Sequence, residues 1–420
     1  MTTPHEDRDL DIVVHGATGF VGALTAAHLR DAAPDDVRIG LSGRSREKLA
    51  ATRADLGGRA ADWPLLEVDS LDSDDMARLG DSTRVVATTV GPYDRLGLPL
   101  VEACAEAGTH YADLTGEVTF IRRSIDAAHE VASASGARVV HSCGFDSIPS
   151  DLGVFLLADH AATHDLGSLG DTTLVVTGIR AGVSGGTIDS MRTQLDRAME
   201  DRAARRLMAR PDALASSPGD DAGHAHDDAQ RARQKDPVGI VHDEDLGGWL
   251  APFFMGRVNT RVVRRSNALA GHAGPAFRYR ELMLGGPLPL GPARAAAIAG
   301  GTAALAAGLA FPPTRAVLDR VLPDPGEGPS AATQERGFFR IDIHTTTTTG
   351  ARLVCEIHAH GDPGYRSTAV MLGQSALALA GDPDRLPDRA GVLTPSTAMG
   401  HELARRLRAA GHRYDVVTAH

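Results

Sequence analysis

Short runs of apolar residues alternate with longer amphipathic stretches over the first 140 residues of the chain. The apolar runs are too short for helices and predict six strands, at 12–14, 37–42, 65–68, 84–90, 110–114 and 138–141. The stretches between them have helical periodicity. Strands and helices that alternate at this spacing form a parallel sheet with right-handed crossovers. We therefore expect a doubly wound α/β domain over residues 1–157.

The pattern changes beyond this domain. Further apolar runs predict a strand and a hairpin, at 173–180, 338–344 and 352–360. We expect a second, α+β domain at 158–362, with a mixed or antiparallel sheet. Charged, alanine-rich residues near 200–245 predict a flexible insertion in this domain. The remaining residues, 363–420, predict helices that pack back on the first domain.

A glycine-rich turn joins the first predicted strand to the first predicted helix. Its glycines follow the spacing G-x-x-G-x-x-G in DIVVHGATGFVG, residues 11–22. Such a turn lets the backbone approach a diphosphate at the start of a helix, as in Rossmann domains. The residues expected to contact a dinucleotide are Gly16, Ala17, Thr18, Gly19, Phe20, Val21 and Gly22. The alternative is a plain strand-to-helix turn.

The end of the second strand indicates which dinucleotide binds. NAD-binding domains usually place an acidic residue there, which holds the ribose hydroxyls. This chain instead has Ser42, Gly43 and Arg44, with Arg46 two residues further on and no carboxylate. Guanidinium groups match a 2′-phosphate, so we expect NADP(H). The alternative is that both arginines only cap and solubilise the following helix.

Two further strand ends point to the same edge of the sheet. Asp69 follows the third strand and is expected near the adenine. The fourth strand leads into Val90, Gly91 and Pro92, a turn expected beside the nicotinamide ribose. Tyr93 comes next, and it is either a proton donor or a packed ring.

Polar residues are dense after the sixth strand, in HSCGFDSIPSD at 141–151. A polar cluster at the end of a core strand is typical of an active-site mouth. Asp146 and Ser147 are the candidate catalytic residues, with capping of the helix near Pro149 as the alternative. Cys143 is expected to be a small buried residue rather than a nucleophile.

Composition excludes several classes of function. The net charge is −11 and aromatic residues make up only 4% of the chain, which argues against a nucleic-acid partner. The three cysteines form neither a disulfide framework nor a zinc-like pair. His224 and His226 are expected in a solvated loop, so we expect no metal site. The polar N-terminus carries no signal peptide, which favours the cytoplasm.

One stretch of 17 residues without a charge, 295–311, complicates this localisation. It is short for a membrane span, and alanine and glycine drive insertion poorly. A buried helix or an interfacial helix is expected instead. The interfacial alternative implies peripheral association with a membrane or lipid surface.

The motifs together resemble the saccharopine dehydrogenase-like oxidoreductases, in particular their trans-acting enoyl reductase branch. The resemblance extends over nearly the whole chain through GATGFVG, SGRSREKL, VGPYDRLGLPLVEAC, GTHYADLTGE, CGFDSIPSDLG, SGGTIDSM, PDPGEGPS, GDPGY and GVLTPSTAMG. It implies an NADP-type Rossmann domain, a second domain with a mixed sheet, and reduction of lipid-like or polyketide-derived enoyl chains.

The resemblance leaves three hypotheses for function. The first is NADPH-dependent reduction of a C=C bond in a small-molecule or carrier-bound acyl substrate, with Tyr93, Asp146 and Ser147 donating the proton or polarising the carbonyl. The second is a saccharopine-type dehydrogenase on an amino acid or imine. It is disfavoured because the chain has only two lysines, neither of them between Tyr93 and Asp151. The third is a non-catalytic NADP-binding protein at lipid surfaces. A homodimer is compatible with all three.

Overall fold

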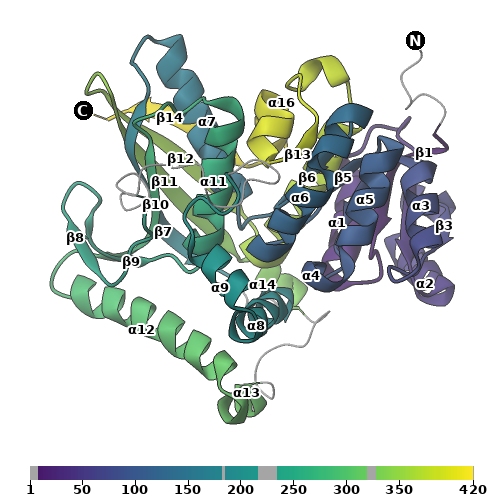
Figure 1. The fold of residues 1–420 in the computed structure, drawn as a ribbon, viewed down its shortest axis with the longest axis horizontal. Helices are drawn as coiled ribbons and strands as arrows, with labels where there is room; N and C mark the ends of the chain where they lie inside the picture. Colours follow the sequence, from purple (N-terminus) through teal and green to yellow (C-terminus); the bar gives the residue numbers. More distant parts are fainter. Residues whose placement is uncertain (1–7, 182–184, 216–233, 319–327, 420) are drawn as a thin grey trace. The chain divides into compact units, whose positions relative to one another are not determined.

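A computed structural model describes residues 8–181, 185–215, 234–318 and 328–419 of the chain (Figure 1). The chain divides into two compact units, which are described separately. Unit 1 comprises Met1–Ile148, Pro325–Gly328 and Gly364–Ala410. Unit 2 comprises Pro149–Asp324, Pro329–Pro363 and Gly411–His420.

Unit 1 is built on a parallel sheet of seven strands in the order β13-β6-β5-β4-β1-β2-β3. All six residues of the central strand β1 are buried, as expected for a strand covered on both faces. The strands are β1 (Leu10–His15), β2 (Ile39–Gly43), β3 (Leu65–Glu67), β4 (Thr83–Thr88), β5 (His110–Ala112), β6 (Arg138–Val140) and β13 (Gly391–Leu393).

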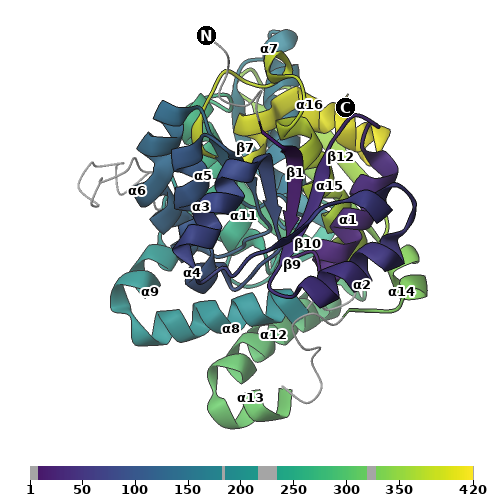
Figure 2. The same cartoon turned by 90° about the vertical axis from the view of Figure 1, so that its right-hand side faces the viewer.

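Helices cover both faces of this sheet. On one face α5 packs between α3 and α6, and on the other α15 packs between α1 and α16 (Figure 2). The helices of unit 1 are α1 (Phe20–Ala32), α2 (Arg46–Leu56), η1 (Gly58–Asp62), α3 (Ser73–Ser82), α4 (Tyr93–Leu96), α5 (Leu98–Ala107), α6 (Val118–Ser135), α15 (Thr368–Leu379), η3 (Pro383–Arg385) and α16 (Pro395–Ala409). The predicted doubly wound α/β fold is confirmed.

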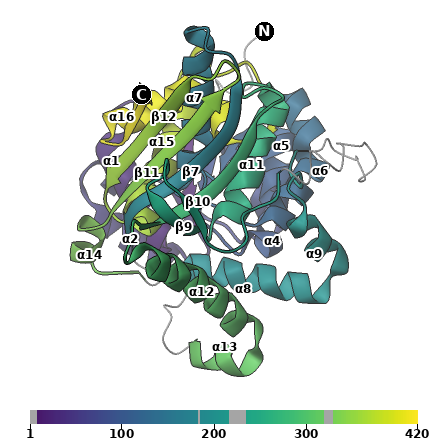
Figure 3. The same ribbon diagram turned by 90° about the vertical axis from the view of Figure 1, so that its left-hand side faces the viewer.

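Unit 2 contains a mixed sheet of seven strands in the order β14-β12-β11-β7-β10-β9-β8 (Figure 3). Strands β7 and β10 are parallel, and the other neighbours are antiparallel. The strands are β7 (Leu169–Arg180), β8 (Val241–Asp243), β9 (Gly248–Pro252), β10 (Arg278–Gly286), β11 (Phe338–Thr347), β12 (Arg352–His360) and β14 (Arg413–Thr418). The predicted hairpin corresponds to β11 and β12.

The helices of unit 2 are α7 (Ile148–Thr163), α8 (Gly185–Glu200), α9 (Arg202–Ala209), α11 (Gly256–Ala270), α12 (Gly291–Ala310), α13 (Pro312–Leu318) and α14 (Ala331–Glu335). A π-helical turn, η2 (Pro363–Ser367), precedes α15. Helix α7 packs closely on the sheet, because a Cβ at its Gly153 would lie 2.5 Å from Ile343 Cδ1 and 2.8 Å from Ile357 Cδ1.

The units differ from the expected domain boundaries. The first segment of unit 1 ends at Ile148 rather than at 157, because α7 packs on the second sheet. The C-terminal residues 411–420 belong to unit 2, because β14 pairs with β12. The sequence analysis did not predict strand β13, because it lies outside the alternating pattern of the first 140 residues and joins this sheet only by pairing with β6. Residues 216–233 of the expected insertion, His224 and His226 among them, lie outside the described residues.

Candidate cofactor site and the neighbouring strand ends

The glycine turn after β1 packs its backbone directly against α1 and the loop after β4. Gly16 has φ +84°, and a Cβ at this position would lie 2.8 Å from Val90 Cγ2. A Cβ at Gly22 would lie 2.1 Å from the carbonyl oxygen of Gly16, so α1 touches the turn directly. The Gly19 N–H donates to the Gly16 carbonyl at 2.9 Å. The turn is therefore closed by backbone contacts that side chains would prevent.

The N-terminus of α1 is open to an anion. Its N-cap residue is Gly19, which has no side chain to bond the first N–H groups, and no acidic residue lies in the first turn. Ala17 is buried beneath the turn, Thr18 is exposed, and Phe20 and Val21 are partly buried. The positive end of the helix dipole is therefore not neutralised by a side chain, which is the condition under which helix N-termini attract anions.

At the end of β2, the buried Ser42 is followed two residues later by the exposed Arg44. The buried Ser42 hydroxyl lies 3.0 Å from His15 Nδ1, and the other nitrogen of this imidazole lies 3.0 Å from Ser70 Oγ. Burial lowers the pKa of His15 to about 4, so the ring is neutral. Gly43 is also buried, whereas Arg44 is exposed. The N-cap of α2 is Ser45, whose Oγ accepts from the Lys48 N–H at 3.3 Å.

Asp69 is exposed in the loop after β3. Its carboxylate accepts from the Leu71 N–H at 3.1 Å, and its own N–H donates to the Asp75 carboxylate at 2.7 Å. Both contacts form a local turn, which sets the direction of the chain at this strand end.

The turn after β4 leads into a buried tyrosine. The Val90 N–H donates to the Thr88 hydroxyl at 3.2 Å, and Gly91 and Pro92 continue to α4. The Tyr93 hydroxyl donates to the Thr88 carbonyl at 3.2 Å and accepts from the Leu114 N–H at 3.3 Å. Its ring stacks on Phe120 with centroids 5.8 Å apart. Burial raises the pKa of Tyr93 well above its usual value.

Glu117 holds the start of α4 in place. Its two carboxylate oxygens accept the N–H groups of Tyr93 at 3.2 Å and Asp94 at 2.7 Å. Glu117 itself is fully buried at the end of the loop that follows β5. A buried carboxylate therefore ties the loop after β4 to the loop after β5.

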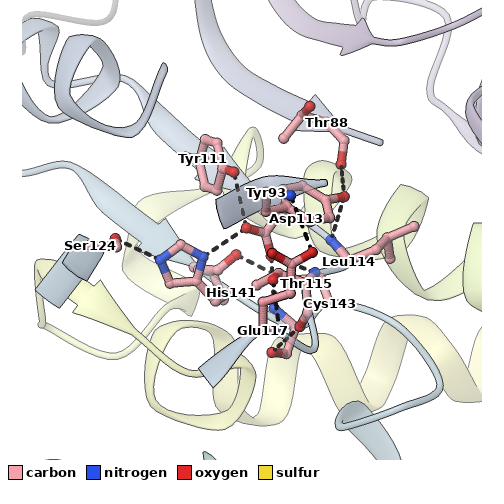
Figure 4. Close-up of polar contacts among 12 residues, drawn as sticks. Thr88, Tyr93, Tyr111, Asp113, Leu114, Thr115, Glu117, Ser124, His141 and Cys143 are labelled. Carbon is pink, nitrogen blue, oxygen red and sulfur yellow. Dashed lines mark hydrogen bonds and ion pairs between the residues drawn. The ribbon is translucent and has the colours of Figure 1, made fainter. Parts of the chain in front are cut away.

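A second buried carboxylate, Asp113, joins the ends of β5 and β6 (Figure 4). One of its oxygens accepts from the Tyr111 hydroxyl at 2.9 Å and from His141 Nδ1 at 2.7 Å. The other accepts the N–H groups of Thr115 at 3.1 Å and Ser142 at 2.9 Å. His141 Nε2 in turn accepts from the Ser124 hydroxyl of α6 at 2.7 Å.

The order Ser124–His141–Asp113 is that of a hydrolytic triad. All three side chains are buried, with exposed fractions of 0%, 3% and 0%. A nucleophile in this position cannot meet a substrate, so the three residues fix the ends of strands and do not catalyse hydrolysis.

The loop after β6 carries Asp146 and Ser147. Asp146 is partly exposed, and no hydrogen bond or ion pair of its carboxylate is recorded within the described part of the chain. Desolvation raises its pKa from 3.8 to about 6. Ser147 is fully buried, and its N–H lies 3.3 Å from the Gly144 carbonyl. Cys143 is buried too, in agreement with its expected packing role.

The sequence analysis missed the two buried carboxylates of the site. Asp113 and Glu117 both lie in GTHYADLTGE, two and six residues away from Tyr111. An acidic residue directly after a core strand was the available signal for Asp113, and Glu117 had none of this kind. Across the described residues, no group of three or more His, Cys, Asp or Glu side chains could hold a metal ion.

Comparison with known proteins gives consistent results. A family model for the saccharopine dehydrogenase NADP-binding domain matches residues 12–140. A protein of Mycobacterium tuberculosis H37Rv that bears the name trans-acting enoyl reductase is 48% identical over 415 residues, 96% of each chain. A trans-acting enoyl reductase of Mycobacterium bovis BCG is 46% identical over 410 residues, 96% of this chain and 97% of its own.

A solved structure shows the same fold. The apo saccharopine dehydrogenase (L-Glu forming) of Saccharomyces cerevisiae superposes with a TM-score of 0.52 at 12% identity, over 98% of this chain and 100% of its own. The predicted NADP-type domain and the predicted family resemblance are both confirmed.

Proposed function

Because the chain belongs to the trans-acting enoyl reductase family and has a saccharopine dehydrogenase-type NADP-binding domain, we propose that it reduces a C=C bond of an acyl intermediate with NADPH. The observation that carries this proposal is the 46–48% identity to trans-acting enoyl reductases over 96% of the chain. A saccharopine-type reaction is less favoured, because the saccharopine dehydrogenase family model covers only the NADP-binding domain at residues 12–140, and beyond it the similarity to the solved saccharopine dehydrogenase, at 12% identity, is one of fold.

NADPH fits the residues at the end of β2. A 2′-phosphate is a dianion that a guanidinium group binds through paired hydrogen bonds. Arg44 is exposed at this position, and Ser45 already caps α2. Arg44 is therefore available to the cofactor, and Gly16, Gly19 and Gly22 form the cradle for its diphosphate. Asp69 and the turn at 90–92 complete the binding edge.

The acyl substrate is proposed to be an enoyl thioester, either small or bound to a carrier. When bound, the cofactor would supply a hydride for the β-carbon of the C=C bond, and a group of this chain would have to provide the proton for the α-carbon. Asp146 suits this role because its pKa of about 6 keeps part of the carboxyl protonated near neutral pH. The Tyr93 hydroxyl is bonded to the Thr88 carbonyl, and Ser147 is buried. We assign the proton to Asp146 rather than to either of them.

Helix α12 is proposed to lie on a lipid surface. Of the described helices it alone is long and apolar enough to cross a membrane, and only 11% of its most apolar stretch is buried. Exposed apolar side chains flank it: Leu288, Leu290 and Phe311 have exposed fractions of 72%, 57% and 59%. The helix contains a single charge, Arg294. An exposed apolar surface of this kind is typical of sites that contact a membrane or another protein, and we assign it to a lipid surface.

One experiment tests the reaction. The full-length protein is mixed with NADPH and a series of 2-enoyl thioesters, and absorbance at the reduced nicotinamide band is followed together with mass analysis of the acyl product. We expect NADPH consumption coupled to a gain of two hydrogens in the acyl chain. Turnover of an amino acid or imine but of no enoyl thioester would overturn the proposal.

A second experiment tests the lipid surface. Ala297→Glu and Ala304→Glu together place two charges on the exposed side of α12, and Ala127→Glu with Ala134→Glu places the same charges, at the same spacing, on exposed positions of α6. The α12 variant alone should lose flotation with phospholipid vesicles. Native protein that never floats, but forms a dimer that the α12 variant disrupts, would assign the helix to a second copy instead.

A further inference from the structure

The loop that carries Asp146 is fixed to the sheet at several points. The Ser142 N–H donates to the Asp113 carboxylate, and the Ser142 hydroxyl donates to the Thr115 carbonyl at 2.7 Å. The Cys143 N–H donates to the Asp113 carbonyl at 2.7 Å. Further on, the Phe145 N–H donates to the Thr368 hydroxyl of α15 at 3.0 Å.

Ser142 is one of two described residues other than glycine with positive φ, at +62°. This conformation is unfavourable for a serine and persists only where its surroundings impose it. At Ser142 both the N–H and the hydroxyl are held, by Asp113 and by the chain at Thr115. The chain consequently turns sharply at the end of β6, towards Gly144 and Asp146.

The loop also lacks room to shift. A Cβ at Gly144 would lie 3.0 Å from Leu114 Cδ2 and 3.2 Å from Thr368 Cγ2, so the backbone is packed on both sides. Asp113 is in turn fixed by Tyr111 and by His141, which Ser124 orients from the other side of the ring. The chain of contacts thus runs from α6 through the imidazole to Asp113 and then to the loop.

We propose that Asp113 is the positioning residue of this enzyme, which holds the 142–147 loop so that the Asp146 carboxyl faces the reacting acyl group. Ser124 and His141 act through Asp113 by fixing its carboxylate. This inference rests on the proposed enoyl reduction, because it gives Asp146 the proton-donor role. Its structural part, the fixing of the loop, stands independently of the reaction.

Three variants separate positioning from general stability. Asp113→Asn keeps the volume but offers one acceptor oxygen in place of two, so some of the four donors lose their partner. Ser124→Ala removes only the hydrogen bond to His141, the contact farthest from the loop, and it replaces Asp113→Asn as the test variant if Asp113→Asn folds poorly. The control is Thr109→Val at the opposite end of β5, which removes two buried hydrogen bonds of the Thr109 hydroxyl, to the carbonyls of Gly80 and Thr83.

Two readouts are compared in the full-length protein. Hydrogen exchange of the amides of Ser142 and Cys143 reports the loop without requiring turnover. We expect exchange to accelerate at least about tenfold in Asp113→Asn, less in Ser124→Ala, and not in Thr109→Val. We also expect kcat to fall by about tenfold to a hundredfold in Asp113→Asn, while the Kd for NADPH stays within about twofold.

The outcomes distinguish the two proposals. If Asp113→Asn and Thr109→Val behave alike in exchange, Asp113 is merely structural and the inference is wrong. If the exchange results hold but kcat is unchanged, the loop is fixed by Asp113 without serving catalysis, and the inference again fails. If the wild type turns over no enoyl thioester while exchange responds as expected, the proposed reaction fails and the fixing of the loop remains.

Discussion

Asp146→Asn gives the most direct test of the site, because it changes activity and stability in opposite directions. The Asp146 pKa rises from 3.8 to about 6 on folding, since the carboxyl leaves water for a site without a recorded partner. A shift of this size corresponds to about 3 kcal/mol of unfavourable free energy when the group is ionised. Asparagine has no charge and avoids this penalty.

The sign of the pH dependence follows from proton binding. Between the two pKa values the folded protein binds more protons than the unfolded chain, so the wild type loses stability as pH rises. The loss begins near the unfolded pKa of 3.8 and is complete above the folded value of about 6. The difference in unfolding free energy between Asp146→Asn and wild type should therefore grow by about 2 kcal/mol from pH 4 to pH 7.

Urea unfolding of both proteins across this pH range measures the difference, since errors common to the two curves cancel. Activity should change in the other direction. Loss of a proton donor typically lowers kcat by about 10²- to 10⁴-fold, and the wild-type rate should fall as pH rises through about 6. A stability difference that is constant with pH would refute the desolvation of Asp146. An active variant would refute its role as proton donor.

Three other substitutions test separate parts of the structure. Gly22→Ala should abolish NADPH binding in a calorimetric titration, because the new Cβ would lie 2.1 Å from the Gly16 carbonyl oxygen. The control is Gly300→Ala in α12, where the new Cβ meets open space, and this variant should bind NADPH normally. Arg44→Ala should weaken NADPH at least about tenfold and leave NADH nearly unchanged, and equal losses for both would contradict a 2′-phosphate contact. Glu281→Gln loses one of the two acceptor oxygens that Asn259 and Tyr279 use, so its test is the pH dependence of stability. Burial raises the Glu281 pKa from 4.5 to about 7, so the unfolding free energy of the variant should rise relative to wild type by about 2 kcal/mol from pH 5 to pH 8, and a difference that is the same at both pH values in urea unfolding would disprove this.

The local pattern of apolar and polar residues predicted much of the fold. The strands of unit 1 are runs of apolar residues bounded by turns, and such runs predict buried parallel strands without any knowledge of contacts. The glycine turn was equally clear, because each of its glycines has a local backbone reason to be there. The hairpin of unit 2 was predicted from two apolar runs on either side of a threonine-rich turn. Strand β13 could not be predicted from the sequence, because only its pairing with β6 makes Gly391–Leu393 a strand.

The sequence by itself determined the fold class of this protein, its dinucleotide turn and its family, because these depend on spacing along the chain. Only the tertiary structure decided what each polar side chain does. Tyr93 and Asp146 look alike as polar residues after core strands, yet the hydroxyl of one is bonded to the Thr88 carbonyl and the carboxyl of the other is desolvated without a recorded partner among the described residues. Two of the four donors to Asp113, His141 and Ser142, reach it only because β5 and β6 lie side by side. Burial and hydrogen bonding arise between residues that are distant in sequence, and these two quantities set the chemistry of the site.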